Sequence, residues 1–368
     1  MNINEKYIKR CLTLAKRGKG KVSPNPLVGA VIVKNDHVIS EGYHHYFGGD
    51  HAERDAIKKS DPDSLKGSTI YINLEPCSHY GKTPPCSVLI RDSRIKKVVY
   101  SIHDPNPLTK NKADKLFKDS GISVETGVLS KEAFLLNRAF FTNIINKRAF
   151  ITLKLASTLD GRISDFSYNS RWISGPDSMK IVHNLRYECD AIMGGINTVL
   201  YDNPLFTVRH PRKKKKIYRI ILDSNCRIPI ESNIVRTAKE NPVIVICKKC
   251  EKQKHILLKK HGVTVWKDLD KGLHHILKRL YSELSIGHIF CEGGGKIAGS
   301  LIKNHLADEI IMFFAPKILG DKAIPSFFLG NEIPISKAFK YSLDSIKKVG
   351  EDVMIKYYSK ELICLQDS

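Results

Sequence analysis

The feature that most constrains this chain is a group of metal-binding residue types at three separate points of its N-terminal third. A histidine stands at position 51, two cysteines follow at Cys77 and Cys86, and Glu53 lies two residues after the histidine. Three protein ligands and an open fourth position are typical of a catalytic zinc site, where a carboxylate that does not bind the metal can move protons. Any fold of this region therefore has to bring His51, Cys77 and Cys86 to one place.

The pattern H-x-E followed by P-C is typical of zinc-dependent deaminases, in which the second cysteine usually comes three residues after the first. Here eight residues separate Cys77 from Cys86, and we interpret them as a loop that contacts substrate. Zinc lowers the pKa of a bound water to roughly 7, and Glu53 would take its proton, deliver it to a ring nitrogen and then help the amine leave as ammonia. The predicted reaction is hydrolytic deamination of a heterocycle.

These residue types also have ordinary structural interpretations. Asp50 and Glu53 have the spacing of a capping box, in which Glu53 would only cap a helix that begins there. Free cysteines are commonly buried in cores, and this interpretation suits the isolated ones, Cys11, Cys189, Cys226 and Cys364. A second zinc site at Cys247 and Cys250, beside His255, is not expected because a matching second ligand pair is missing.

Composition indicates an ordinary globular protein. The 368 residues are room for about two domains, and no apolar run is long enough to span a membrane. Nine cysteines without the density of a secreted scaffold favour a reducing cytoplasm. The formal net charge of +22 leaves a nucleic-acid partner open, but the lysines are scattered, so we interpret the charge as compositional bias and expect no nucleic acid.

Hydrophobic periodicity predicts an α/β protein with two domains, residues 1–146 and 147–368. The first would open on an amphipathic helix with Ile3, Tyr7, Cys11, Leu14 and Ala15 on one face. Strands and helices then alternate in both halves, which predicts a mostly parallel sheet in the second. The expected strands there are 149–155, 217–222, 242–247, 263–266, 288–291 and 309–315, and the expected helices are 176–187, 269–284 and 296–305.

The second half contains a glycine-rich turn that follows a strand and opens a helix. Its residues are Glu292, Gly293, Gly294, Gly295, Lys296, Ile297, Ala298, Gly299 and Ser300. Backbone N–H groups of such a turn can approach a phosphate, whereas the alternative is a turn needed only for packing. A polar loop at 155–162 also leaves a strand, at the usual place for ligand contacts in α/β sheets.

Motifs in both halves resemble one known family, the bifunctional riboflavin-biosynthesis deaminases/reductases. In the first half they are PNPLVGAVIV, GYHHYFGGDHAE, LEPCSHYGKTPPC and DPNP, and in the second KLASTLDGRI, SRWISGP, TVLYDNPLFTVR and EGGGKIAGSLI. The resemblance covers nearly the whole chain in order. It implies a cytidine-deaminase-like, three-layer α/β/α domain followed by a dihydrofolate-reductase-like α/β domain.

The resemblance also implies two consecutive reactions and their site residues. The first domain would deaminate 2,5-diamino-6-ribosylamino-4(3H)-pyrimidinone 5′-phosphate, with zinc on His51, Cys77 and Cys86 and with Glu53 as the proton carrier. The second would use NADPH to reduce the ribosyl group to ribityl. Implied substrate contacts are Asn25, His44, His79 and Lys82 in the first domain and Ser170, Arg186, Phe206, Arg209 and Glu292 in the second. Implied cofactor contacts are Ala156, Trp172, Thr198, Asp202, Ser224 and the run from Gly294 to Ser300.

Two positions depart from the family pattern: Ala156 stands where some relatives carry glycine, and Phe206 where others carry leucine. The family implies a homo-oligomer that acts on a small phosphorylated pyrimidine. The alternative is a zinc-dependent tRNA deaminase with an accessory domain, which the net charge favours and the spacing from Cys77 to Cys86 opposes.

Overall fold

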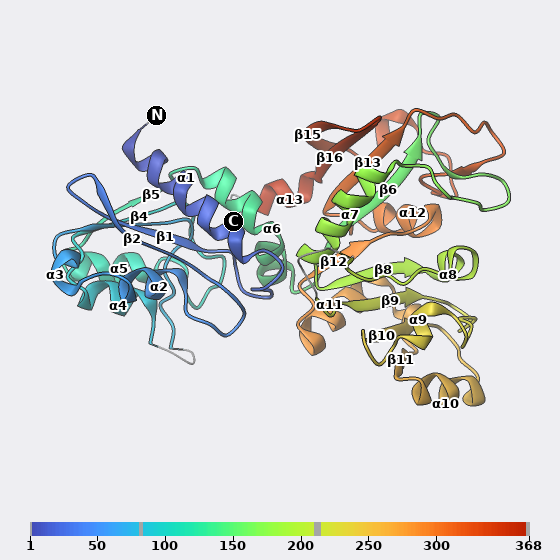
Figure 1. The fold of residues 1–368 in the computed structure, drawn as a ribbon, viewed down its shortest axis with the longest axis horizontal. Helices are drawn as coiled ribbons and strands as arrows, with labels where there is room; N and C mark the ends of the chain where they lie inside the picture. The colour runs from blue at the N-terminus through green and yellow to red at the C-terminus, as the bar shows by residue number, and fades with distance from the viewer. Residues whose placement is uncertain (1, 81–83, 210–214, 366–368) are drawn as a thin grey trace. The chain divides into compact units, whose positions relative to one another are not determined.

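The computed structural model describes residues 2–80, 84–209 and 215–365 (Figure 1). These residues form two compact units, one running to Asn146 and including Leu365, the other spanning Lys147–Cys364. The predicted domain boundary near Lys147 thus lies at the start of the second unit.

The first unit is built on a five-stranded sheet. β1 is antiparallel to both of its neighbours, whereas β3, β4 and β5 are parallel to one another. The strand order across the sheet is β2 (His37–Tyr43), β1 (Gly29–Lys34), β3 (Thr69–Ile72), β4 (Lys97–Tyr100) and β5 (Ser123–Thr126). Nearly all side chains of β1 and β3 are buried, as expected for strands that are covered on both faces.

Helices cover both faces of this sheet, so the predicted three-layer fold is confirmed. One face packs against α1 (Ile3–Ala15) and α6 (Ser130–Asn146). The other packs against α2 (Ala52–Lys58), α3 (Pro62–Leu65), α4 (Cys86–Asp92) and α5 (Lys112–Asp119). The predicted amphipathic helix is α1, although its Ile3 is exposed.

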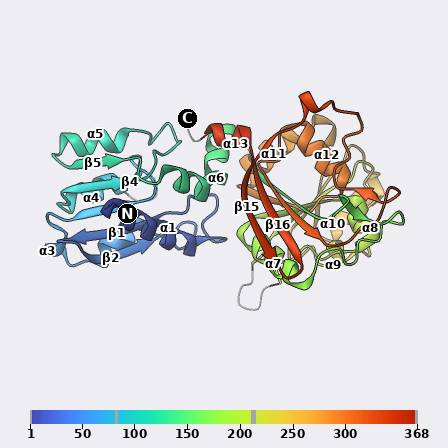
Figure 2. The same ribbon diagram turned by 90° about the horizontal axis from the view of Figure 1, so that it is seen from above.

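The second unit is built on a nine-stranded sheet that is parallel over its first seven strands. Their order is β11 (Val263–Trp266), β10 (Val243–Ile246), β9 (Tyr218–Leu222), β8 (Ala191–Gly195), β12 (His288–Cys291), β6 (Phe150–Thr158) and β13 (Glu309–Ala315). An antiparallel hairpin of β16 (Asp352–Ser359) and β15 (Tyr341–Val349) completes it (Figure 2). The prediction of a mostly parallel sheet is confirmed.

Helices cover both faces of this sheet as well. One face packs against α11 (Leu273–Leu284) and α12 (Gly295–Lys303). The other packs against α7 (Pro176–Glu188), α8 (Ile196–Asp202), α9 (Asn233–Arg236) and α10 (Lys252–Lys260). The remaining elements are a small ribbon of β7 (Arg162–Ser164) and β14 (Ile324–Pro325), and the helix α13 (Lys360–Cys364). None of the helices within the described ranges is long and apolar enough to cross a membrane.

Two sequence predictions about this unit are wrong. The helix expected from Leu269 to Leu284 is divided, because Gly272 adopts a φ of 85° between a 3₁₀ turn and α11, a conformation that favours glycine. Cys226 is not an isolated core cysteine, because it forms a disulfide with Cys250. Cys247 remains a free, buried thiol.

Candidate active sites

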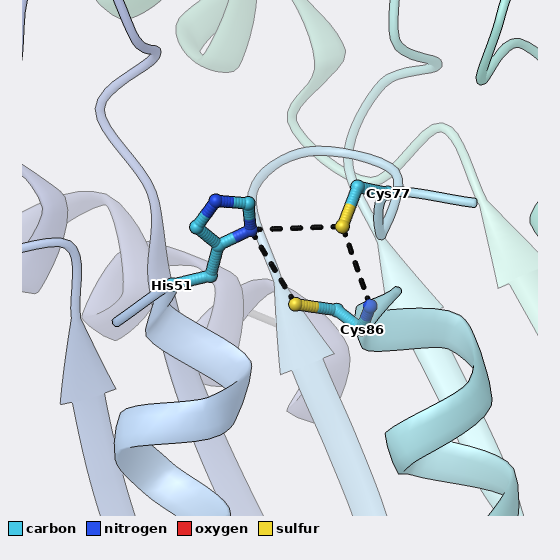
Figure 3. Close-up of side chains that lie close together, drawn as sticks. All are labelled: His51, Cys77 and Cys86. Carbon is cyan, nitrogen blue, oxygen red and sulfur yellow. Dashed lines mark hydrogen bonds between the residues drawn. The ribbon is translucent and has the colours of Figure 1, made fainter. Parts of the chain in front are cut away.

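His51, Cys77 and Cys86 converge in the first unit, as Figure 3 shows. The Nδ1 atom of His51 lies 3.6 Å from the sulfur of Cys77 and 3.5 Å from that of Cys86. All three potential ligand atoms lie within 4.8 Å of one another. Among the described residues, this is the one group of three or more histidine, cysteine and acidic side chains with such spacing.

Local backbone structure explains how three separate points of the chain meet. His51 is the extended N-cap residue of α2, and Cys86 is the first residue of α4, after Pro84 and Pro85. The backbone N–H of Cys86 donates to the sulfur of Cys77, 3.3 Å away. Because helix N-termini favour negative charge, the start of α4 is a suitable place for a thiolate ligand at Cys86.

The N-cap position of His51 also explains how Glu53 reaches the same site. The alternative interpretation, a capping box of Asp50 and Glu53, is excluded because His51 rather than Asp50 is the N-cap, and Asp50 pairs with Lys58. Two residues of an ideal helix at this separation would point nearly opposite ways. Since the backbone of His51 is still extended, its ring and the Glu53 carboxyl can serve one site. Glu53 is 3% exposed and hydrogen-bonds to Cys86.

Hydrogen bonds among these side chains shift their pKa values, and the hydrogen bond with Cys77 raises the pKa of the Cys86 thiol. A hydrogen bond from Cys86 is the main reason why the pKa of Cys77 falls to about 4. A hydrogen bond to Cys77 raises the pKa of His51 to about 9. Burial raises the pKa of Glu53 to about 7. Imidazole and thiolate are ligands that zinc prefers, so these residues fit the metal.

Asn25 and His44 lie next to this group. The ring of His44 is 5.5 Å from that of His51, between centroids, and burial lowers its pKa. Nδ1 of His44 lies 2.9 Å from the carbonyl oxygen of Asp50, and Nε2 lies 3.1 Å from Nδ2 of Asn25. A neutral ring must therefore donate from Nδ1 and accept at Nε2. That arrangement leaves the side-chain oxygen of Asn25 available as an acceptor.

The other two substrate contacts implied in this unit are less constrained. His79 is exposed, and its Nδ1 lies 3.1 Å from the hydroxyl of Thr109. Lys82 lies outside the described residues.

A second group of polar side chains gathers at the carboxyl ends of the parallel strands in the second unit. Arg186 on α7 pairs with Glu292, which follows β12, through contacts of 2.5 and 2.9 Å. Ser170 donates to Asp202 at the end of α8, 3.2 Å away. Ligand sites of open α/β sheets lie at this edge.

Sequence reasoning missed Lys154, which belongs to this second group. It lies on β6 and interacts electrostatically with Glu292 and Arg186, and burial lowers its pKa. A lone lysine in the strand sequence AFITLKL looks like an ordinary outward-facing residue. Only the pairing of β12 with β6 reveals that the two strands stand side by side.

The glycines of this turn have different surroundings. A Cβ on Gly299 would collide with the carbonyl oxygen of Phe328, so this glycine allows close packing of α12. A Cβ on Gly294 would meet nothing within 4 Å, which leaves the turn at the start of α12 open to a ligand. Of the remaining run, Lys296 is exposed, Ile297 and Ser300 are half-buried, and Gly295 and Ala298 are buried.

The other residues implied for the second unit are spread over its strand ends and loops. Ala156 lies on β6 and Thr198 on α8, both half-buried, and Ser224 is exposed in the turn after β9. Trp172 is 67% exposed. Arg209 is exposed, and its backbone N–H donates to the ring of His183. Phe206, by contrast, is a core residue, 3% exposed in the cluster beside β8 and β9.

Comparison with known proteins decides the family. A model of the zinc-binding region of cytidine and deoxycytidylate deaminases matches residues 1–102, and a model of the RibD C-terminal domain matches residues 149–355. The riboflavin biosynthesis protein RibD of Aquifex aeolicus is 41% identical over 353 residues, which cover 96% of this chain and 98% of that protein. The chain belongs to the RibD family. RibD of Actinobacillus pleuropneumoniae is 38% identical and covers 95% of the chain.

Solved RibD structures share the fold of the whole chain. RibD of Acinetobacter baumannii (form 1) is 32% identical, with a TM-score of 0.88 over 97% of this chain and 98% of that one. A deaminase/reductase from Thermotoga maritima is 36% identical, with a TM-score of 0.86 over 97% and 99%. As a RibD protein, the chain is a bifunctional deaminase and reductase of riboflavin biosynthesis. This membership favours the bifunctional enzyme over a tRNA deaminase with an accessory domain.

Proposed function

We propose that the first unit deaminates 2,5-diamino-6-ribosylamino-4(3H)-pyrimidinone 5′-phosphate and that the second reduces the deaminated ribosyl product with NADPH. The observation that carries this proposal is the buried Glu53 carboxyl beside three convergent zinc ligands, in a chain whose other half belongs to a reductase family. The relative from Thermotoga maritima is named for the same two activities.

In the first reaction, water replaces the 2-amino group and ammonia leaves. Zinc held by His51, Cys77 and Cys86 supplies the electrophilic activation of that water when it is bound. Glu53 accepts a proton from the water and passes it to the ring nitrogen, then takes the proton of the newly added hydroxyl and gives it to the departing amine. Its pKa of about 7 suits a group that must both accept and release protons near neutral pH.

Asn25 and His44 orient the pyrimidine in this proposal. Because His44 accepts a hydrogen bond from the Asn25 amide, the oxygen of Asn25 can accept one from an N–H group of the ring. His79 and Lys82 bind the phosphate, for which cationic or hydrogen-bond-donating side chains are suited.

In the second reaction the sugar carbonyl carbon gains a hydride and its oxygen gains a proton. NADPH supplies the hydride when it is bound near Ala156, Trp172, Thr198, Asp202, Ser224 and the turn from Gly294 to Ser300. Lys154 interacts electrostatically with Glu292, and we assign these two residues to hold the sugar and its proton. Arg186, Arg209 and Ser170 bind the ribosyl phosphate side, and Phe206 supports them from the core.

The test is a coupled assay with purified enzyme. Ammonia release from the diaminopyrimidinone phosphate, followed by NADPH oxidation only after deamination, is the expected result. Ammonia release without any NADPH oxidation would refute the second half of the proposal, and NADPH oxidation without prior deamination would refute the order. The cytoplasmic location, the homo-oligomer and the absence of a nucleic-acid partner stay predictions.

A further inference from the structure

The buried carboxylate of Glu75, two residues before Cys77, is not part of the zinc ligand set or of the implied substrate contacts. Its side chain is fully buried, and its own backbone N–H donates to the carbonyl oxygen of Ile102. A buried carboxylate is costly unless its oxygens are hydrogen-bonded. The partners of Glu75 therefore indicate what it is for.

The partners of its carboxylate all belong to one segment, residues 103–113, which comprises the loop after β4 and the first two residues of α5 and is called here the loop 103–113. The backbone N–H groups of Asp104 and Asn111 each donate to Oε2 of Glu75 at 3.2 Å, and that of Ala113 donates to Oε1 at 3.4 Å. Nδ1 of His103 lies 3.2 Å from Oε2. One carboxylate thus holds both ends of the loop, including the start of α5, where negative charge is favourable.

The loop between these two ends is held in shape by its own hydrogen bonds. The side chain of Asp104 accepts from the backbone N–H of Asn106 at 2.8 Å, and the side chain of Asn106 accepts from that of Leu108 at 3.0 Å. The backbone N–H of Thr109 donates to the carbonyl oxygen of Asn106 at 2.8 Å. Because the loop is internally bonded, fixing its ends fixes the place of Thr109 at its far side.

Thr109 connects this loop with His79, one of the implied substrate contacts of the first unit. Its side chain is fully buried, yet its hydroxyl lies 3.1 Å from Nδ1 of the exposed His79. A hydrogen bond at Nδ1 fixes the plane of the imidazole ring and leaves Nε2 for a ligand. An exposed histidine without such a bond would lose rotamer freedom only when substrate binds, which weakens binding.

We propose that Glu75 is a positioning residue for substrate binding, which acts through the loop 103–113 and Thr109 to hold the ring of His79. The proposal rests on the proposed function of His79 as a substrate contact. It assigns to the Glu-Pro-Cys segment two separate tasks, metal binding by Cys77 and substrate positioning by Glu75.

The test compares the variants Glu75→Gln, Thr109→Val and Thr109→Ser in the deaminase assay. A glutamine offers one acceptor oxygen instead of two, so its NH₂ group must face an N–H donor of the loop. Valine keeps the shape of threonine but has no hydroxyl, whereas serine retains the hydroxyl. Glu125→Gln, on β5 of the same unit, makes the same chemical change in a carboxylate that bonds Asn4 and Lys97 instead.

We expect Glu75→Gln and Thr109→Val each to raise KM about two- to ten-fold, the range that the loss of one net hydrogen bond allows. The kcat and the zinc content should stay near wild type. Thr109→Ser should restore KM, and the double variant Glu75→Gln/Thr109→Val should be no worse than the poorer single variant, because both act on one contact. Glu125→Gln should leave KM unchanged.

Three results would overturn the proposal. One is an unchanged KM in Thr109→Val. This variant can be measured even if Glu75→Gln does not fold. Another is a loss of zinc and kcat at unchanged KM in Glu75→Gln, which would mean that Glu75 supports only the metal loop. The third is additive effects of the two changes. If the wild type itself released no ammonia, the proposed function would fail instead, so the two failures are distinguishable.

Discussion

Replacing Arg186 with methionine should destabilise the second unit, because the Glu292 carboxylate would remain buried without its main partner. The two side chains are 11% and 14% exposed and join through two contacts of 2.5 and 2.9 Å. Arg186 also donates to the carbonyl oxygen of Thr207 at 3.0 Å. Removing one partner of a buried ion pair costs about 3–5 kcal/mol. Since Lys154 remains near Glu292 as a positive charge, we expect about 3 kcal/mol, the lower end of that range.

The loss should depend on pH in a defined direction. In the wild type, burial raises the pKa of Glu292, but the Arg186 guanidinium more than offsets this and the pKa is lowered. Glu292 then contributes stability above the pKa of an unfolded glutamate, and this stability is lost as the pH falls through the folded pKa. Without Arg186 the pKa of Glu292 rises. As the pH falls, the carboxylate of the variant is therefore protonated at a higher pH than that of the wild type, which removes the unpaired buried charge. The difference in unfolding free energy should therefore shrink as the pH falls from about 7 to about 4.

The assay is denaturant unfolding of the second unit, with Lys180→Met as the matched control on the same helix. Lys180 pairs with Asp177 on the surface, with 77% and 54% exposure, so its loss should cost less than about 1 kcal/mol. Arg186→Met combined with Glu292→Leu should regain stability but not NADPH oxidation. If Arg186→Met lost less than about 1 kcal/mol of unfolding free energy, or if the loss grew as the pH fell, Arg186 would not be the group that stabilises the buried Glu292 carboxylate.

Three further predictions concern the metal and the packing within the two units. Cys86→Ser should lower the zinc content and abolish ammonia release, while NADPH oxidation with pre-deaminated substrate continues; metal analysis and the two assays check this. Gly42→Ala should lower the melting temperature of the first unit and its zinc retention, because the added Cβ would collide with the carbonyl oxygen of Ala52 on α2; an unchanged melting curve would contradict it. Arg148→Met should cost about 3–5 kcal/mol of unfolding free energy. Arg148 pairs with Asp308 at 2.7 Å, both side chains are buried, and the carboxylate would lose its partner. A denaturant titration that shows no loss of stability would contradict this prediction.

The zinc ligands could be predicted from sequence because each of them stands in a short motif of metal-binding residue types. His51 and Cys86 stand at helix starts that are marked by turn residues. Histidine and cysteine are also the residue types that zinc prefers as ligands. What the sequence could not reveal was how His51 and Glu53 share one site. That depends on which residue is the N-cap of α2: the spacing to Glu53 suggested Asp50, whereas the structure has His51.

The second site could be predicted less completely, because its residues meet only through strand order. Lys154 approaches Glu292 because β12 pairs with β6, and these strands are more than a hundred residues apart in the chain. The hairpin of β15 and β16 escaped prediction because β15 is mostly exposed and rich in polar residues, so it lacks the apolar pattern of the other strands. Cys226 and Cys250 are 24 residues apart, a separation that carries no pairing signal.

The most direct test of the central claim is the replacement Glu53→Gln, measured for zinc content, ammonia release and NADPH oxidation in one preparation. Glutamine keeps the shape of the side chain but cannot carry the proton. We expect full zinc content, no ammonia release, and undiminished NADPH oxidation when the deaminated substrate is supplied. Ammonia release at the wild-type rate by the zinc-loaded variant would contradict this expectation.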